Sequence, residues 1–157
     1  MGKALVHDDL RVTTPATFVE MTSDELRQAF LDDNPHRWGA RDVRHHLMFV
    51  IAWQDSNALL AKFVNTEALV KRVEKLSAKG YRDYDYQLGD FFKRTLCGLE
   101  ADGFDFTYEL QGVRQVGQNI VFKHGKTCYT LYWVERKGAG KSAARSREFI
   151  LDSLALA

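Results

Sequence analysis

Residues 104–110 read FDFTYEL, and this short stretch decides the fold. Apolar residues occupy every second position, and polar residues fill the positions between them. Because successive side chains of a β-strand point to opposite faces of a sheet, the pattern predicts a strand with one buried face. We expect the buried face to hold Phe104, Phe106, Tyr108 and Leu110, and the other face to hold Asp105, Thr107 and Glu109.

Further strands are predicted on both sides of this stretch. Turn signals at Ala101-Asp102-Gly103, Gln111-Gly112 and His124-Gly125 punctuate strands near 92–100, 104–111, 114–123 and 127–136. Strands joined by such short turns pair with their neighbours, so an antiparallel meander follows. An earlier strand is predicted over residues 44–53, RHHLMFVIAW. Both faces of this strand are apolar, which indicates that other elements cover it on both sides.

Helices are expected before, between and after these strands. The segment Thr22-Ser23-Asp24-Glu25 is a capping box, and proline disfavours helix at the residue before it, so a first helix runs from about 23 to 33 and ends at Asn34-Pro35. A loop follows at 36–39. Helical spacing predicts a second helix over 66–79, with Leu69, Val73 and Leu76 inward, and a last helix over 142–155, with Phe149, Ile150 and Leu154 on one side and Ser142 as its cap.

This order of elements predicts an α+β fold, a three-layer αβα sandwich whose largely antiparallel sheet carries helices on both faces. Neither a linker rich in proline and serine nor an internal repeat divides the sequence, and both prolines fall before residue 40. We therefore expect a single domain over residues 1–157, with an ordered core at about 10–155.

Composition excludes several classes of protein. The 157 residues contain 22 Lys and Arg against 21 Asp and Glu, and a net charge of +1 gives no global field to attract nucleic acid. The longest apolar run, 47–53, is too short to span a membrane. The start of the sequence lacks the apolar run of a secretory leader, so we expect a cytoplasmic protein. Cys97 and Cys128 form no metal or redox motif and are expected as free thiols.

The order of elements resembles the fold shared by the PsbP extrinsic subunits of photosystem II, a related Ran-binding nuclear import factor and the DcrB-like bacterial proteins. Three segments carry the resemblance: Pro15-Ala16-Thr17-Phe18, the strand GKTCYTLYW at 125–133, and the helix FILDSL at 149–154. The resemblance implies the three-layer sandwich and the non-enzymatic binding role of many members. It transfers no functional residue to this sequence.

Motifs for catalysis and cofactor binding are missing from the sequence. Adjacent residues of a strand point to opposite faces, so His45 and His46 do not share one metal ion. The segment GAGKS at 138–142 resembles a phosphate-binding loop, but position 135 is Glu where that motif needs glycine. We predict no catalytic residue, no metal and no cofactor.

One segment has a clear charge asymmetry. Five of its cations, with no acidic residue among them, lie between the end of the last long strand and the first turns of the last helix. They are Arg136, Lys137, Lys141, Arg145 and Arg147. A solvated loop is the simple interpretation, and a docking patch for an acidic protein, a lipid headgroup or nucleic acid is the alternative. Arg37 and Trp38 form a second candidate, because Arg and Trp dominate binding hot spots.

The leading functional hypothesis is a cytoplasmic adaptor that binds a protein partner of acidic character through Arg37, Trp38, Arg136, Lys137, Lys141 and Arg145. One alternative is an enzyme or small-ligand binder with a pocket between sheet and helix. Another, implied by the DcrB-like resemblance, is a chaperone for secreted or membrane-inserted segments. A polar cleft with converging titratable groups would favour the enzyme, and a large apolar groove would favour the chaperone.

Overall fold

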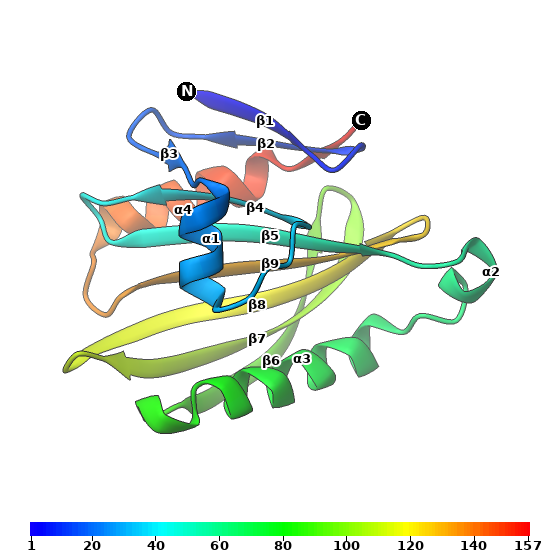
Figure 1. Cartoon of the computed structure of the whole chain (residues 1–157). Coiled ribbons are helices and arrows are strands. Elements are labelled where there is room, and N and C mark those ends of the chain that lie inside the picture. The colour runs from blue at the N-terminus through cyan, green and yellow to red at the C-terminus, as the bar shows by residue number, and fades with distance from the viewer.

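The computed structural model describes residues 1–157, with side chains at every position except Ala58 and Leu60. The strands of its main sheet are β3 (Val19–Glu20), β4 (Arg37–Asp42), β5 (Leu47–Asp55), β6 (Gln87–Leu96), β7 (Leu99–Leu110), β8 (Val113–His124) and β9 (Thr127–Arg136). They pair antiparallel in the order β3-β4-β5-β9-β8-β7-β6 (Figure 1).

A second sheet has three strands and contains both ends of the chain. It consists of β1 (Gly2–Val6), β2 (Leu10–Thr14) and β10 (Ala155–Leu156), and β2 lies in the middle. The helices are α1 (Ser23–Phe30), α2 (Ala58–Ala61), α3 (Thr66–Gly80) and α4 (Lys141–Ser153), with a short 3₁₀ turn at Arg82–Tyr84. In the part of the chain that the structure describes, none of these helices has the length and apolar character needed to cross a membrane.

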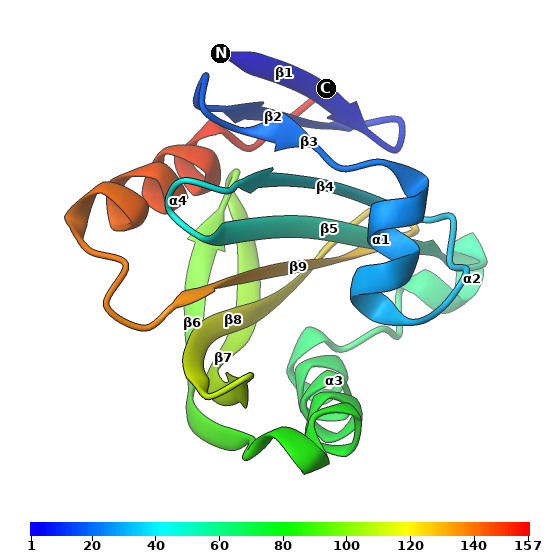
Figure 2. The same cartoon turned by 60° about the vertical axis from the view of Figure 1, so that its left-hand side comes forward.

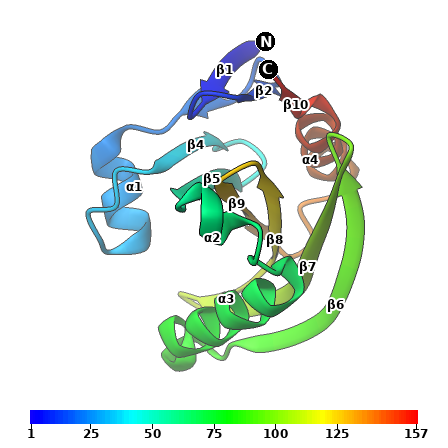
Figure 3. The same ribbon diagram turned by 90° about the vertical axis from the view of Figure 1, so that its right-hand side faces the viewer.

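The main sheet forms the middle of three layers (Figures 2 and 3). On one face, α1 and α3 cover it, and the main sheet curves around α3. On the other face lie α4 and the three-stranded sheet. Each face has its own apolar core: Leu26 and Val70 pack with Phe106 on the first, and Leu10 and Ile150 pack with Phe49 on the second. The α+β sandwich with helices on both faces is confirmed.

The stretch at 104–110 forms the expected strand. Phe104, Phe106 and Tyr108 are at most 7% exposed and share the core under α1 and α3. Leu110 is 44% exposed, because it is the last residue of β7 and reaches past the helices that cover the strand's earlier residues. The periodic pattern therefore predicted the buried face correctly for three of its four apolar residues.

The turn predicted at Ala101-Asp102-Gly103 is wrong. Those residues lie inside β7, and the chain turns at Cys97 and Gly98, both of which have positive φ. Gly103 has a different purpose, because a Cβ atom there would lie 2.5 Å from Cζ of Phe92. The glycine lets an aromatic ring from the neighbouring strand lie flat against the sheet.

The first capping box is confirmed, but the chain around it differs from expectation. The Thr22 hydroxyl accepts a hydrogen bond from the Glu25 amide, and α1 ends earlier than predicted because Leu31 adopts the left-handed conformation. The predicted loop at 36–39 is wrong, since β4 begins at Arg37 and pairs with β5. Both His45 and His46 lie in the turn between these strands, not on the strand itself.

The other two long helices also correct side-chain assignments. In α3, Leu69 and Val73 pack inward as expected, but Leu76 is 64% exposed and Val70 takes the buried position. The N-cap of α4 is Gly140 rather than Ser142, and no side chain caps it. Phe149 is 39% exposed, and Ala143, Ile150 and Leu151 provide the buried side of α4.

Candidate functional site

Four of the cations singled out from the sequence gather where β9 leads into α4. Arg136, Lys137, Lys141 and Arg145 are all exposed. Among the side chains that the structure describes, no carboxylate lies within 4.0 Å of any of their charged nitrogens. Their charges therefore face solvent without local neutralisation.

The backbone between β9 and α4 fixes these cations in place. The Lys137 amide donates a hydrogen bond to the Arg114 carbonyl at 2.9 Å, and the Ala139 amide donates to the Arg136 carbonyl at 3.1 Å. The helix then starts at Gly140 with no acidic residue in its first turn. Since a helix N-terminus carries partial positive charge, the cations and the helix add to one field of the same sign.

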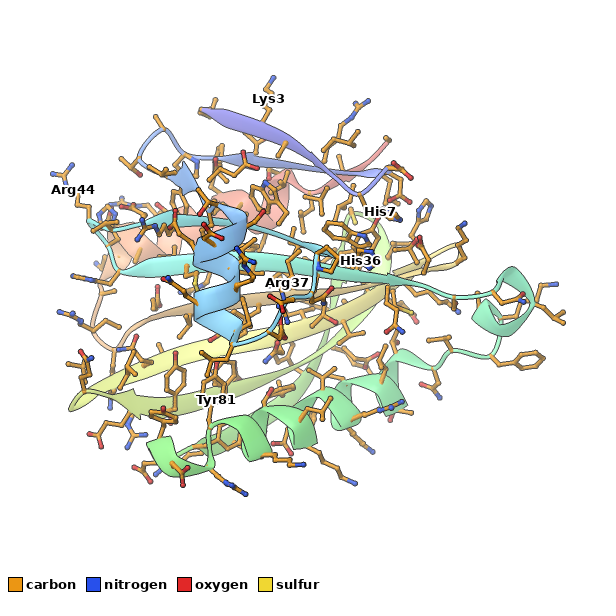
Figure 4. The ribbon with its side chains drawn as sticks, viewed as in Figure 1. Lys3, His7, His36, Arg37, Arg44 and Tyr81 are labelled. Atoms are coloured by element: carbon orange, nitrogen blue, oxygen red, sulfur yellow. The ribbon has the colours of Figure 1, made fainter. Side chains whose placement is uncertain are left out.

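A fifth cation joins them from the turn between β4 and β5. Leu47, the first residue of β5, pairs with Glu135 near the end of β9, so the two turns lie side by side at one end of the sheet. Arg44 in this turn is exposed and points away from the molecule (Figure 4). Sequence reasoning missed it because it placed Arg44 on a strand. The residues of this basic surface are Arg44, Arg136, Lys137, Lys141 and Arg145.

Arg147, which belongs to the same cluster in the sequence, does not share this surface. Its Nη1 donates to Oε1 of Glu135 at 2.6 Å, and its guanidinium lies 4.2 Å from the ring centroid of Trp133. The second carboxylate oxygen of Glu135 is buried and has no hydrogen-bond partner. Arg147 therefore neutralises a buried acid and packs α4 against the sheet.

Arg37 and Trp38, the second predicted interface, lie at the far end of β4 from the basic surface. Arg37 is largely occupied within the molecule: its guanidinium stacks over Phe30 at 4.2 Å and pairs with Asp32, Nη2 to Oδ2 at 2.9 Å (Figure 4). Trp38 is half-buried against the core on the α4 side, and its Nε1 is buried without a partner. The structure does not bring these two residues together with the basic cations.

Histidines that are far apart in the sequence meet at the end of the sheet opposite the basic surface. Nε2 of His7 lies 3.0 Å from Oδ2 of Asp55, and Nδ1 of His124 lies 2.7 Å from Oδ2 of Asp9. Burial alone would raise the pKa of Asp9, but hydrogen bonds from Tyr129 and His124 hold it below its ordinary value of 3.8. These pairs tie the β1–β2 turn to β5 and to the β8–β9 turn.

Neither a metal site nor an enclosed reaction chamber accompanies these groups in the described part of the chain. No group of three or more His, Cys, Asp or Glu side chains there has the geometry to hold a metal ion. An open concavity of about 400 Å³ lies beside α1, lined by Ser23, Arg27 and Arg37 among others. A second, of about 370 Å³, lies between α3 and β6, where Lys93 is 2.8 Å from Asp102.

Comparison with known proteins gives structural neighbours only. No protein-family model matches the sequence, and no curated protein matches it. Among solved structures, a protein from Bacteroides thetaiotaomicron superposes with a TM-score of 0.60 at 11% identity over 94% of this chain, which spans 45% of that protein. The cyanobacterial PsbP of Synechocystis superposes with a TM-score of 0.65 at 8% identity, covering 94% of this chain and 86% of its own.

A third neighbour is the Ran-binding protein Mog1p of Saccharomyces cerevisiae, with a TM-score of 0.58 at 6% identity, covering 94% of this chain and 89% of its own. The resemblance to the PsbP and Ran-binding folds that the sequence suggested is thus confirmed at the level of structure. At these identities the likeness establishes the fold.

Proposed function

We propose that this chain is a non-enzymatic protein-binding module that docks an acidic partner on its basic surface. One observation carries the proposal. Five exposed cations lie where β9 leads into α4 and in the adjoining β4–β5 turn, and the described side chains offer them no carboxylate. Cations at this end of a helix are unfavourable by about 0.3–1 kcal/mol each at exposed sites. Selection for stability alone would favour acidic residues there, so binding is the simpler reason for this arrangement.

The basic surface also offers an apolar contact. Val43, in the same turn as Arg44, is 64% exposed. An interface needs an apolar centre that excludes water, with charges at its rim that steer the partner. Val43 supplies the apolar part, and the surrounding lysines and arginines supply the charged rim.

Two further observations support a binding role. The fold is shared with a Ran-binding protein, so it serves protein recognition in at least that neighbour. Both cysteines are free thiols, which suits the reducing cytoplasm that we propose as its compartment. The charged groups at the two concavities pair with each other, Lys93 beside α3 with Asp102 and Arg37 beside α1 with Asp32.

The test is charge reversal on the basic surface. The variant carrying Lys137→Glu and Lys141→Glu should lose partner capture from native lysate, by about tenfold at low salt, in the way that added salt weakens the wild type. The matched control carries Lys75→Glu and Lys79→Glu on exposed positions of α3, with the same change in net charge. Melting temperatures should stay within about 2 °C of the wild type, because exposed substitutions rarely change stability by more than about 0.5 kcal/mol.

Two results would contradict the proposal. One is equal capture of the same partners by the Lys137 and Lys141 variant and by the wild type at low salt. The other is equal loss in the α3 control, which would show that capture follows net charge rather than this surface.

A further inference from the structure

The segment between β5 and α3, residues 57–65, projects beyond the end of the main sheet (Figure 1). Its sequence is NALLAKFVN, six apolar residues with one lysine and no acid. Two of its large side chains face solvent, Leu59 at 68% and Phe63 at 79% exposure. We call residues 57–65 the apolar tip.

The exposure of this tip is built into the fold, because specific hydrogen bonds hold it on the molecule. Nζ of Lys123 on β8 donates to the carbonyls of Ala61 at 2.9 Å and Val64 at 3.3 Å. The Ser56 amide donates to the Lys126 carbonyl at 2.8 Å. At the other end, the Asn65 side chain caps α3. The backbone is therefore anchored at both ends while Leu59 and Phe63 are exposed.

Two cations lie in or beside the tip. Lys62 lies within it, and Lys126 lies in the adjoining β8–β9 turn; both are exposed. Among the described side chains, neither has a carboxylate within 4.0 Å. The nearest acids along the chain are engaged elsewhere, Asp55 with His7 and Glu67 with Lys93 at 3.6 Å. The tip thus combines two exposed apolar side chains with two exposed cations, of which Lys126 also interacts electrostatically with Asp55.

We propose that the apolar tip docks on an anionic lipid bilayer, with Leu59 and Phe63 inserted at the boundary between headgroups and acyl chains. Lys62 and Lys126 would then contact the anionic headgroups. Apolar side chains framed by basic residues are the chemistry that interfacial membrane anchors use. Polybasic contacts add to this attraction near an anionic surface and decay within a Debye length.

The shape of the tip favours a bilayer over a protein groove. Helix-in-groove recognition reads apolar anchors over positions i, i+3, i+4 and i+7, which takes two or more helical turns. The helix in the tip, α2, spans four residues and ends before Phe63. A convex projection with a single-turn helix has nothing to lay along a groove, but it fits a deformable lipid surface.

This inference is independent of the proposed protein-binding role. The tip and the basic surface lie at opposite ends of the main sheet. Strand β5 starts at Leu47, which pairs with Glu135 beside the basic surface, and it ends at Asp55, next to the tip. A molecule seated on lipid through its tip would present the basic surface away from the membrane. The two surfaces can therefore be tested separately in the same protein.

The experiment is flotation of the full chain with vesicles of phosphatidylcholine alone and of phosphatidylcholine with about one third phosphatidylserine. We expect weak, salt-sensitive binding that is stronger on the anionic vesicles. Phe63→Ala should lower the partition coefficient on both kinds of vesicle by about tenfold, because the alanine side chain buries less apolar area in the lipid. The pair Lys62→Glu and Lys126→Glu should weaken binding to the anionic vesicles only.

Two controls match these variants. Leu31→Ala removes a large side chain that is even more exposed, at 89%, from the residue that follows α1, and it should leave binding unchanged. The charge control is the Lys137 and Lys141 reversal on the basic surface, which should also leave vesicle binding unchanged. Because Phe63 is 79% exposed, its variant should melt at the wild-type temperature, so a loss of binding is not a loss of fold.

Three results would overturn the inference. The first is no flotation of the wild type on either vesicle. The second is loss of binding in the Lys137 and Lys141 variant but not in the Phe63 variant. The third is a wild-type dimer, seen by sedimentation, that Phe63→Ala dissociates, which would assign the tip to a contact between copies of the chain.

Discussion

The most informative perturbation of this fold is removal of the Arg147 guanidinium. Arg147→Met keeps most of the apolar stem but leaves the Glu135 carboxylate buried beside Trp133 with no cation. Breaking a fully buried ion pair costs about 3–5 kcal/mol. The two side chains are 19% and 11% exposed, so water softens the penalty, and we expect a loss of about 2–3 kcal/mol with the cation–π contact included.

Equilibrium unfolding in urea measures this loss, and thermal melting gives a second readout. A loss of about 2–3 kcal/mol corresponds to about 5–10 °C in melting temperature for a chain of this size. The matched control is Arg145→Met, an exposed cation two residues earlier on the same helix, which should change stability by less than about 0.5 kcal/mol.

A double-mutant cycle with Glu135→Gln isolates the pair from the loss of packing. Neutralising the acid removes the need for a cation, so Arg147→Met should cost less by at least about 1 kcal/mol in that background. If the cycle shows no coupling, or if Arg147→Met is as mild as Arg145→Met, the buried pair does not stabilise the α4 layer and the reasoning is refuted.

Three further predictions concern titratable groups. Burial alone would raise the pKa of Asp42, but a hydrogen bond with His45 holds that pKa below 3.8. The ionised Asp42 therefore stabilises the fold fully above pH 3.8, and this contribution is lost as the pH falls further. Asp42→Asn should flatten the acid unfolding curve in that window, and an unchanged curve would contradict a stabilising Asp42 carboxylate. Burial raises the pKa of Tyr108 to about 12 and also raises the pKa values of four other tyrosines, so stability should fall as pH rises above 10. Absorbance titration should therefore detect fewer tyrosinates at pH 11 in the folded protein than in denaturant, and equal numbers would contradict the burial of these side chains. Burial also raises the thiol pKa of Cys97 and Cys128, so a disulfide reagent near pH 8 should react slowly with the native protein. In denaturant without reductant the same reagent should count two thiols, and a count of zero would contradict free cysteines.

The sequence predicted the layers well because one physical signal dominated them. The period-two pattern of β7 and the capping box at Thr22 are local features that tertiary packing had no reason to override. Gly103 was wrongly predicted in a turn because glycine serves either a turn or a close approach, and only the position of the Phe92 ring distinguishes the two. Such a contact between strands has no local signature.

The candidate site was predictable only in part for the same reason. Spacing revealed the run of cations, but it could not show that Arg147 turns inward to Glu135 while its neighbours stay in solvent. Nor could it add Arg44, which is about ninety residues away in sequence and reaches the surface through the pairing of β5 with β9. The four-residue separation of Leu59 and Phe63 is a helical spacing, yet Phe63 lies beyond α2 and both side chains are exposed.

The arrangement of β2 between the two chain ends has a consequence for synthesis on the ribosome. The core under α1 and α3 uses no residue beyond Val134 among its buried members, so a nascent chain can assemble it before α4 has been made. The opposite core needs Leu154, and the Leu10 backbone pairs with Leu156. Until residues 154–156 have left the exit tunnel, Leu10 and Val12 stay uncovered, and the growing chain exposes an unpaired apolar strand to chaperones and to neighbouring nascent chains.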